Sequence, residues 1–185
     1  MTLARRIIVG ASGTPGSIRA MRYARELAGK SGAKLVVVHA WVPPGGELAD
    51  RRSPSPILRD VWQRAAWQRL RDCVEAAWGG MPADVQTSLV VARGAAGDVL
   101  TDLASGSDDL LIVGAGRRGP LARIGHGRVT RYCLAHAASP VLAIPPAALA
   151  ARARLGLRVA FRGLDAAKLT REINTGGGPA TERAR

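Results

Sequence analysis

The chain has 185 residues and a formal net charge of +13, and this length suits one compact domain plus a short extension, which leaves little room for a second core. A hydrophobic fraction of 47% against 22% charged residues excludes wholesale disorder. The two cysteines, Cys73 and Cys133, lie far apart in segments with helical patterns; this argues against a disulfide scaffold and against a metal site.

The first 41 residues combine apolar runs with an amphipathic segment. Residues 6–10 (RIIVG) form a β-branched run that ends in glycine, and residues 15–30 repeat apolar side chains at helical spacing. Thr14 or Ser12 is expected to cap this helix. Residues 34–41 (KLVVVHAW) form a second apolar run, which is typical of a strand buried on both faces of a parallel sheet. This order predicts a complete β-α-β unit.

The alternation continues to residue 146, interrupted by a predicted loop at residues 43–56, which contain four prolines and two glycines. The later segments are predicted as helix 57–78, strand 85–92, helix 96–105, strand 109–113, a glycine- and arginine-rich loop at 114–127, helix 128–137 and strand 141–144. Five strands separated by helices predict an α/β fold with a doubly wound, five-stranded parallel sheet and helices on both faces. Its ligand crevice should lie where the loops after the first and fourth strands meet.

The pattern ends at residue 146, so we expect a folded domain over residues 1–146 and a basic extension over residues 147–185 that is partly disordered. From residue 146 onward the chain has eight basic residues and three acidic ones. Leu157, Phe161 and Leu164 could form the apolar side of a short basic helix, but a flexible solvated extension is the simpler interpretation.

Three segments together resemble one known family. Residues 109–145 (DLLIVGAGRRGPLARIGHGRVTRYCLAHAASPVLAIP) combine a strand ending in glycine, a glycine-rich loop, a helix ending in His-Ala, and a final strand that begins after Pro140. The segments IIVGASGTPGSIRAMRYARELA and VVARGAAGDVLTDLA match the same pattern. In these segments the chain resembles the universal stress protein family. The resemblance implies an adenine nucleotide alpha hydrolase-like fold and a non-catalytic role in the stress response.

The nucleotide-binding members of that family carry the motif G-x2-G-x9-G-[ST], whose backbone N–H groups hold phosphates. Counted from Gly114, Arg117 replaces the second glycine, Gly127 is the third and Arg128 takes the Ser/Thr position. A shifted frame, Gly116-x2-Gly119, recovers the second glycine with a shorter loop. Ser12 stands where the family commonly has an aspartate. The resemblance implies a site for ATP or another adenine nucleotide, with any Mg²⁺ accompanying the nucleotide. Its residues would be Ser12, Gly13 and Ala40 at the nucleoside, and Gly114, Arg117, Gly127, Arg128 and Val129 around the phosphates.

Other functions remain open beside nucleotide binding. The chain could be a family member that binds no nucleotide and acts through its dimer surface and basic extension. A nucleotide hydrolase is disfavoured because neither loop contains an acidic residue that could hold Mg²⁺. A nonspecific nucleic-acid binder would use the +13 charge, and its affinity would fall steeply with salt. The sequence shows no catalytic triad, carboxylate pair or metal-ligand spacing, so no catalytic or metal-binding residue is predicted.

The final strand, Val141–Ile144, resembles the edge through which family members commonly dimerise. An apolar edge strand without a partner favours aggregation, so we expect a homodimer through this strand. No apolar segment approaches the length of a membrane span. We therefore expect a cytoplasmic protein.

Overall fold

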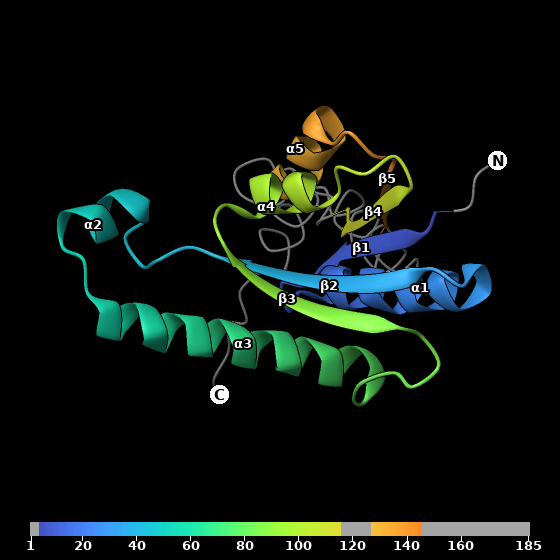
Figure 1. Cartoon of the computed structure of the whole chain (residues 1–185), viewed down its shortest axis with the longest axis horizontal. Helices are drawn as coiled ribbons and strands as arrows, with labels where there is room; N and C mark the ends of the chain where they lie inside the picture. Colours follow the sequence, from blue (N-terminus) through green and yellow to red (C-terminus); the bar gives the residue numbers. More distant parts are fainter. Residues whose placement is uncertain (1–3, 116–126, 146–185) are drawn as a thin grey trace, which may run out of the picture. The chain divides into compact units, whose positions relative to one another are not determined.

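A five-stranded parallel sheet organises the fold of the computed structural model, which describes residues 4–115 and 127–145 (Figure 1). The strand order is β3-β2-β1-β4-β5, and every neighbouring pair is parallel. This confirms the predicted α/β class and its doubly wound sheet. The strands are β1 (Arg6–Gly10), β2 (Lys34–Trp41), β3 (Thr87–Arg93), β4 (Asp109–Gly114) and β5 (Val141–Ile144).

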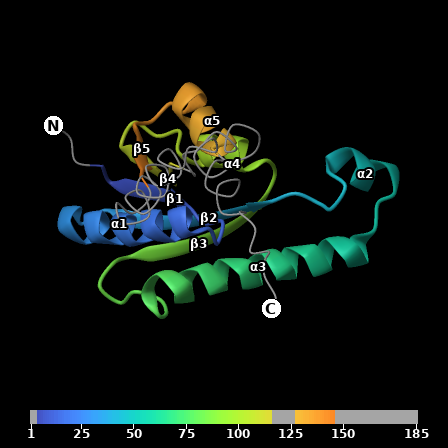
Figure 2. The same cartoon turned by 180° about the vertical axis from the view of Figure 1, so that it is seen from behind.

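Helices cover both faces of this sheet (Figures 1 and 2). Ile7 and Val9 of β1 belong to a core cluster with α1 and α3, whereas Ile8 between them belongs to a cluster with α4 and α5. Alternate side chains of one strand thus enter two separate cores, which explains why the central strands are apolar throughout. The helices are α1 (Pro15–Ser31), α2 (Glu47–Arg52), α3 (Pro56–Trp78), α4 (Ala96–Leu103) and α5 (Arg128–His136).

The first helix begins as the sequence predicts. The Thr14 hydroxyl accepts a hydrogen bond from the backbone N–H of Ser17 at 3.2 Å, and Pro15 occupies the first helical position. Gly32 ends the helix in the left-handed conformation, with a φ of 68°. Thr14, rather than Ser12, is therefore the capping residue.

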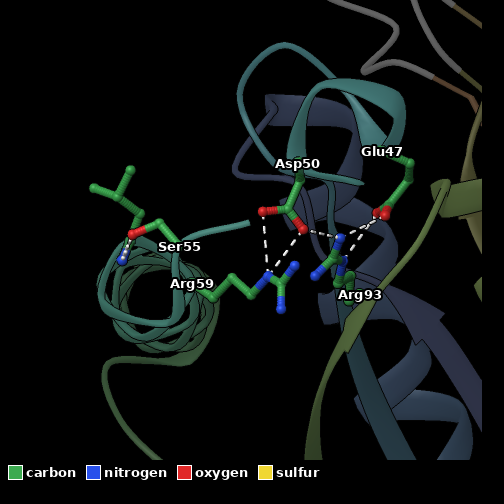
Figure 3. A network of polar contacts seen from close by, with 6 residues as sticks. Glu47, Asp50, Ser55, Arg59 and Arg93 are labelled. Carbon is green, nitrogen blue, oxygen red and sulfur yellow. Dashed lines mark hydrogen bonds and ion pairs between the residues drawn. The ribbon is translucent and has the colours of Figure 1, made fainter. Parts of the chain in front are cut away.

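The predicted loop at residues 43–56 contains a helix that the sequence interpretation missed. Six residues are too few to hold a helix on their own, and α2 is held by ion pairs from other elements (Figure 3). The buried Asp50 carboxylate accepts from Arg59 Nε of α3 at 2.9 Å and from Arg93 Nη2 of β3 at 2.6 Å. Burial raises the pKa of Asp50, but the hydrogen bonds from Arg93 and Arg59 outweigh this effect and hold it below its ordinary value.

A second ion pair joins the amino ends of β1 and β4, where Arg6 and Asp109 are register partners. Arg6 Nε and Nη2 donate to the two carboxylate oxygens of Asp109 at 2.8 and 2.6 Å. The backbone N–H of Gly106 donates to the same carboxylate at 2.8 Å. The hydrogen bond from Arg6 is the main reason that the pKa of Asp109 lies below its ordinary value. This bidentate pair fixes the register of the two central strands.

The predicted basic extension at residues 147–185 lies outside the described residues, as does most of the loop after β4. The division into a domain at 1–146 and an extension therefore stays a prediction.

Candidate functional site

The strand order reverses between β1 and β4, and open α/β sheets form their ligand crevice at the carboxyl ends of the strands at such a reversal. From β1 the chain passes into α1 on one face of the sheet, and from β4 it leads to α5 on the other. The two loops therefore leave the sheet in opposite directions from neighbouring strands. Open α/β sheets bind ligands at such a point.

The end of β4 contacts the first turn of α1 at the carboxyl edge of the sheet. A Cβ atom added to Gly114 would lie 2.7 Å from the carbonyl carbon of Gly16 and 3.1 Å from the backbone nitrogen of Ser17. Only glycine allows the end of β4 to approach the start of α1 this closely. The Thr130 hydroxyl of α5 donates to the Gly114 carbonyl oxygen at 2.8 Å. Gly114 is thus the point where β4, α1 and α5 meet.

Hydrogen bonds fix the first part of the loop after β1 against β2. The backbone N–H of Ala11 donates to Val38 at 2.8 Å, and His39 Nδ1 donates to the Ala11 carbonyl oxygen at 2.7 Å. Ser12 next to it is exposed, with its hydroxyl 3.1 Å from the Thr14 hydroxyl. This arrangement holds a hydroxyl group at the carboxyl edge of the sheet, where a ligand in the crevice can reach it.

Helix α3 also reaches this loop, through two residues that the sequence interpretation did not select. A Cβ atom at Gly13 would lie 3.2 Å from Nε of Arg69, and the φ of Gly13 is +75°. The Cys73 thiol lies one turn further along α3, near the backbone of Gly13. Burial raises the pKa of Cys73, and the nearby Arg69 charge offsets this only in part. Cys73 is therefore a packed thiol rather than a reactive thiolate.

After the loop that follows β4, the described part of the chain resumes at Gly127, immediately before α5. Gly127 has a φ of 99°, and no side chain caps the helix that follows it. Arg128 and Val129 are exposed in its first turn, which has no acidic residue. The first turn of α1 has none either. Both helices thus present unneutralised N-termini, which attract anions.

The structure brings most of the predicted site residues to the same edge of the sheet. Ser12 and Gly13 lie in the loop after β1, and Gly114 contacts the first turn of α1, which follows that loop. Ala40 stands near the carboxyl end of β2, two residues beyond the last residue of β2 that pairs with β1. Gly127, Arg128 and Val129 are connected to Gly114 through Thr130. Arg117 lies outside the described residues.

Across residues 4–115 and 127–145, no group of three or more His, Cys, Asp or Glu side chains could hold a metal ion. No helix in this part of the chain is long and apolar enough to cross a membrane.

Comparison with known proteins gives a consistent family assignment. The family model for the universal stress protein family matches residues 4–145. No curated protein matches the chain.

Among solved structures, universal stress protein UspA from Lactobacillus plantarum superimposes with a TM-score of 0.58 at 18% identity, over 78% of this chain and 99% of that one. Hypothetical protein MJ0577 gives a TM-score of 0.60 at 13% identity, over 77% and 96% of the two chains. These two likenesses show the fold. A universal stress protein in complex with cAMP is 26% identical over 77% of this chain and 98% of that one, with a TM-score of 0.48.

Proposed function

This chain belongs to the universal stress protein family, and from that premise we propose that it is a non-catalytic, cytoplasmic stress-response protein that binds an adenine nucleotide. The site is the crevice where the loops after β1 and β4 meet. Ser12, Gly13 and Ala40 would face the nucleoside, and the phosphates would lie among Gly114, Arg117, Gly127, Arg128 and Val129.

The close approach of the end of β4 to the start of α1 at Gly114 carries this proposal. It brings the N-terminus of α1 and, through Thr130, the N-terminus of α5 to one edge of the sheet. Each N-terminus contributes about 0.3–1 kcal/mol toward an exposed anion. No aspartate or glutamate occurs in residues 10–17 or 110–136, so nothing within these segments repels a phosphate. The residues of these two segments are therefore chemically compatible with a bound nucleotide.

The same composition supports a binding role without catalysis. Hydrolysis of a nucleotide by the usual route needs carboxylate or hydroxyl ligands for Mg²⁺ and a residue that orients the attacking water. Neither loop has a carboxylate, so Mg²⁺ would be held chiefly by the phosphates. We expect the purified protein to return bound ATP unhydrolysed, as measured by chromatography of the nucleotide after prolonged incubation.

Calorimetric titration with ATP and ADP, with and without Mg²⁺, tests the binding proposal. We expect micromolar affinity, and an Arg128→Glu variant should lose at least tenfold because it replaces a phosphate-binding cation with an anion at the helix N-terminus. Arg131→Glu is the matched control, since it makes the same charge change one turn further into α5, beyond the reach of the helix end.

Absence of heat at millimolar nucleotide would refute the binding proposal. The chain would then belong with family members that bind no nucleotide, and its dimer surface and basic extension would become the candidates for function.

We also propose that the protein is a homodimer that pairs through β5. This strand is at one edge of the sheet, and its Val141, Leu142 and Ala143 are only partly buried. A second copy of the same strand would satisfy the exposed backbone groups of that edge. Light scattering should report a dimer mass for the wild type and a monomer mass for Leu142→Lys. Val141→Lys provides an independent variant with its side chain on the opposite face of β5. A dimer mass in both folded variants would contradict the assignment of this edge.

A further inference from the structure

We propose that Arg69 of α3 binds the anionic part of the nucleotide, so that the site accepts phosphorylated nucleosides in preference to unphosphorylated ones. The inference rests on the proposed function and assigns a residue from outside the two loops to the same crevice. It follows from the position of the Arg69 guanidinium against Gly13 and from the lack of an ion-pair partner for it among residues 4–115 and 127–145.

The Arg69 side chain lies against the loop after β1. Measured from a Cβ built at Gly13, Nε lies at 3.2 Å and both Cζ and Nη2 lie at 3.6 Å. A larger residue at position 13 would push the guanidinium away, and the φ of +75° disfavours such a residue as well. Gly13 therefore leaves the space that lets the cation rest against the backbone at the carboxyl edge of the sheet.

The position of Arg69 along α3 explains why its head group reaches this edge. The buried residues of α3 begin at Ala66 and continue through Leu70 and Cys73, so this part of the helix is packed against the sheet. Arg69 belongs to the same stretch but is itself exposed. Its backbone is fixed by a packed helix, so the side chain starts from a defined position. A binding group on such a helix loses less conformational entropy on meeting a ligand than one on a free loop.

Arg69 differs from the arginines that stabilise the fold. Arg6, Arg25, Arg59 and Arg93 each form an ion pair with a carboxylate. Within the described part of the chain, Arg69 forms no ion pair and donates no side-chain hydrogen bond. Its charge is therefore not neutralised by a structural partner and can serve a ligand.

The donors around this position select the chemistry of the ligand. The guanidinium carries only hydrogen-bond donors, arranged in a planar fork that suits two oxygens of a phosphate. The neighbouring Ser12 hydroxyl is exposed and can donate as well. Because Ser12 and Gly13 are proposed to face the nucleoside, a guanidinium beside them would lie next to the ribose. The ligand group within its reach that accepts hydrogen bonds most strongly is the phosphate joined to that ribose. Unphosphorylated nucleosides lack that group.

Titration of the full chain with ATP and with adenosine tests this inference. Wild type should bind ATP at least tenfold more tightly than adenosine. Arg69→Gln should weaken ATP binding by about 10- to 100-fold, the range for a hydrogen bond to a charged group, and leave adenosine binding unchanged. Arg69→Lys keeps the charge but loses the fork, and should fall between wild type and Arg69→Gln. Arg71→Gln is the control, because it removes an exposed charge of the same helix that hydrogen-bonds only Gln68.

The outcomes separate this inference from the function on which it rests. If wild type binds ATP and Arg69→Gln binds it equally well, Arg69 has no part in the site, although the proposed function stands. Equal losses for ATP and adenosine would also overturn the inference, because they indicate a structural role. If wild type binds neither ligand, the proposed function itself fails, and the role of Arg69 fails with it. Thermal melting of each variant shows whether the fold is intact.

Discussion

The contact between Gly114 and the start of α1 predicts that Gly114→Ala destabilises the protein. The added methyl group would stand 2.7 Å from the carbonyl carbon of Gly16 and 2.8 Å from its oxygen. These are backbone atoms, so no side-chain rotation can relieve the overlap, and β4 or α1 must shift. Overpacking of this kind costs about 1–3 kcal/mol, and we expect the upper end here. For a chain of this length that corresponds to a fall of roughly 6–12 °C in Tm.

The matched control is Gly16→Ala, which adds the same methyl group on the other side of the contact. A Cβ at Gly16 meets no atom within 4 Å, and Gly16 lies in the first turn of α1 without a positive φ. We expect its Tm to equal or slightly exceed that of wild type. Both variants are measured by circular dichroism during heating. If Gly114→Ala melts within about 1 °C of wild type, the close approach of β4 to α1 is refuted.

Three further predictions concern stability outside the crevice. Arg6 holds the pKa of Asp109 in the folded protein below its ordinary value. The pair therefore stabilises the fold above the ordinary aspartate pKa, and this stabilisation is lost as the pH falls through the folded value. The urea midpoints of wild type and Asp109→Asn should differ at pH 7 and converge below about pH 4. Gly29→Ala should stabilise α1 by about 0.5–1 kcal/mol, visible as a higher urea midpoint, because its Cβ would meet one atom at an ordinary 3.6 Å. Asp50→Ala should release α2 and speed trypsin cleavage after Arg52, followed by electrophoresis, and an unchanged rate would contradict the role of the ion pairs.

The strands could be predicted from the sequence because each is an apolar run bounded by residues that end strands. The limits of β1, β2 and β5 agree with the prediction residue for residue. The third strand begins at Thr87 rather than at residue 85, although Val85 is buried. Val85 thus packs against the core although it precedes the strand. Hydrophobicity alone does not distinguish a buried residue inside a strand from a buried residue just before it.

The short helix α2 and the position of Arg69 against Gly13 could not be predicted, for a common physical reason. Both depend on contacts between residues far apart in the sequence. Asp50 is held by Arg93 of a later strand, and Arg69 lies against Gly13 of the first loop. Helical periodicity indicates which side of α3 is buried, but it does not indicate which loop lies beside an exposed arginine. The predicted ligand residues that the structure describes lie at the carboxyl edge that the β-α-β pattern specifies, and their part in binding stays a prediction.

The Arg6–Asp109 pair has a consequence for synthesis of the chain. The central strand β1 is made first, and its partner on one side, β2, follows within the first 41 residues. Its partner on the other side, β4, begins at Asp109, 103 residues after Arg6. At about 5–20 residues per second, a ribosome needs roughly 5–20 s to translate that interval. For that time one side of β1 in the nascent chain has no strand to pair with, and this apolar edge is the part of the emerging protein most in need of a chaperone.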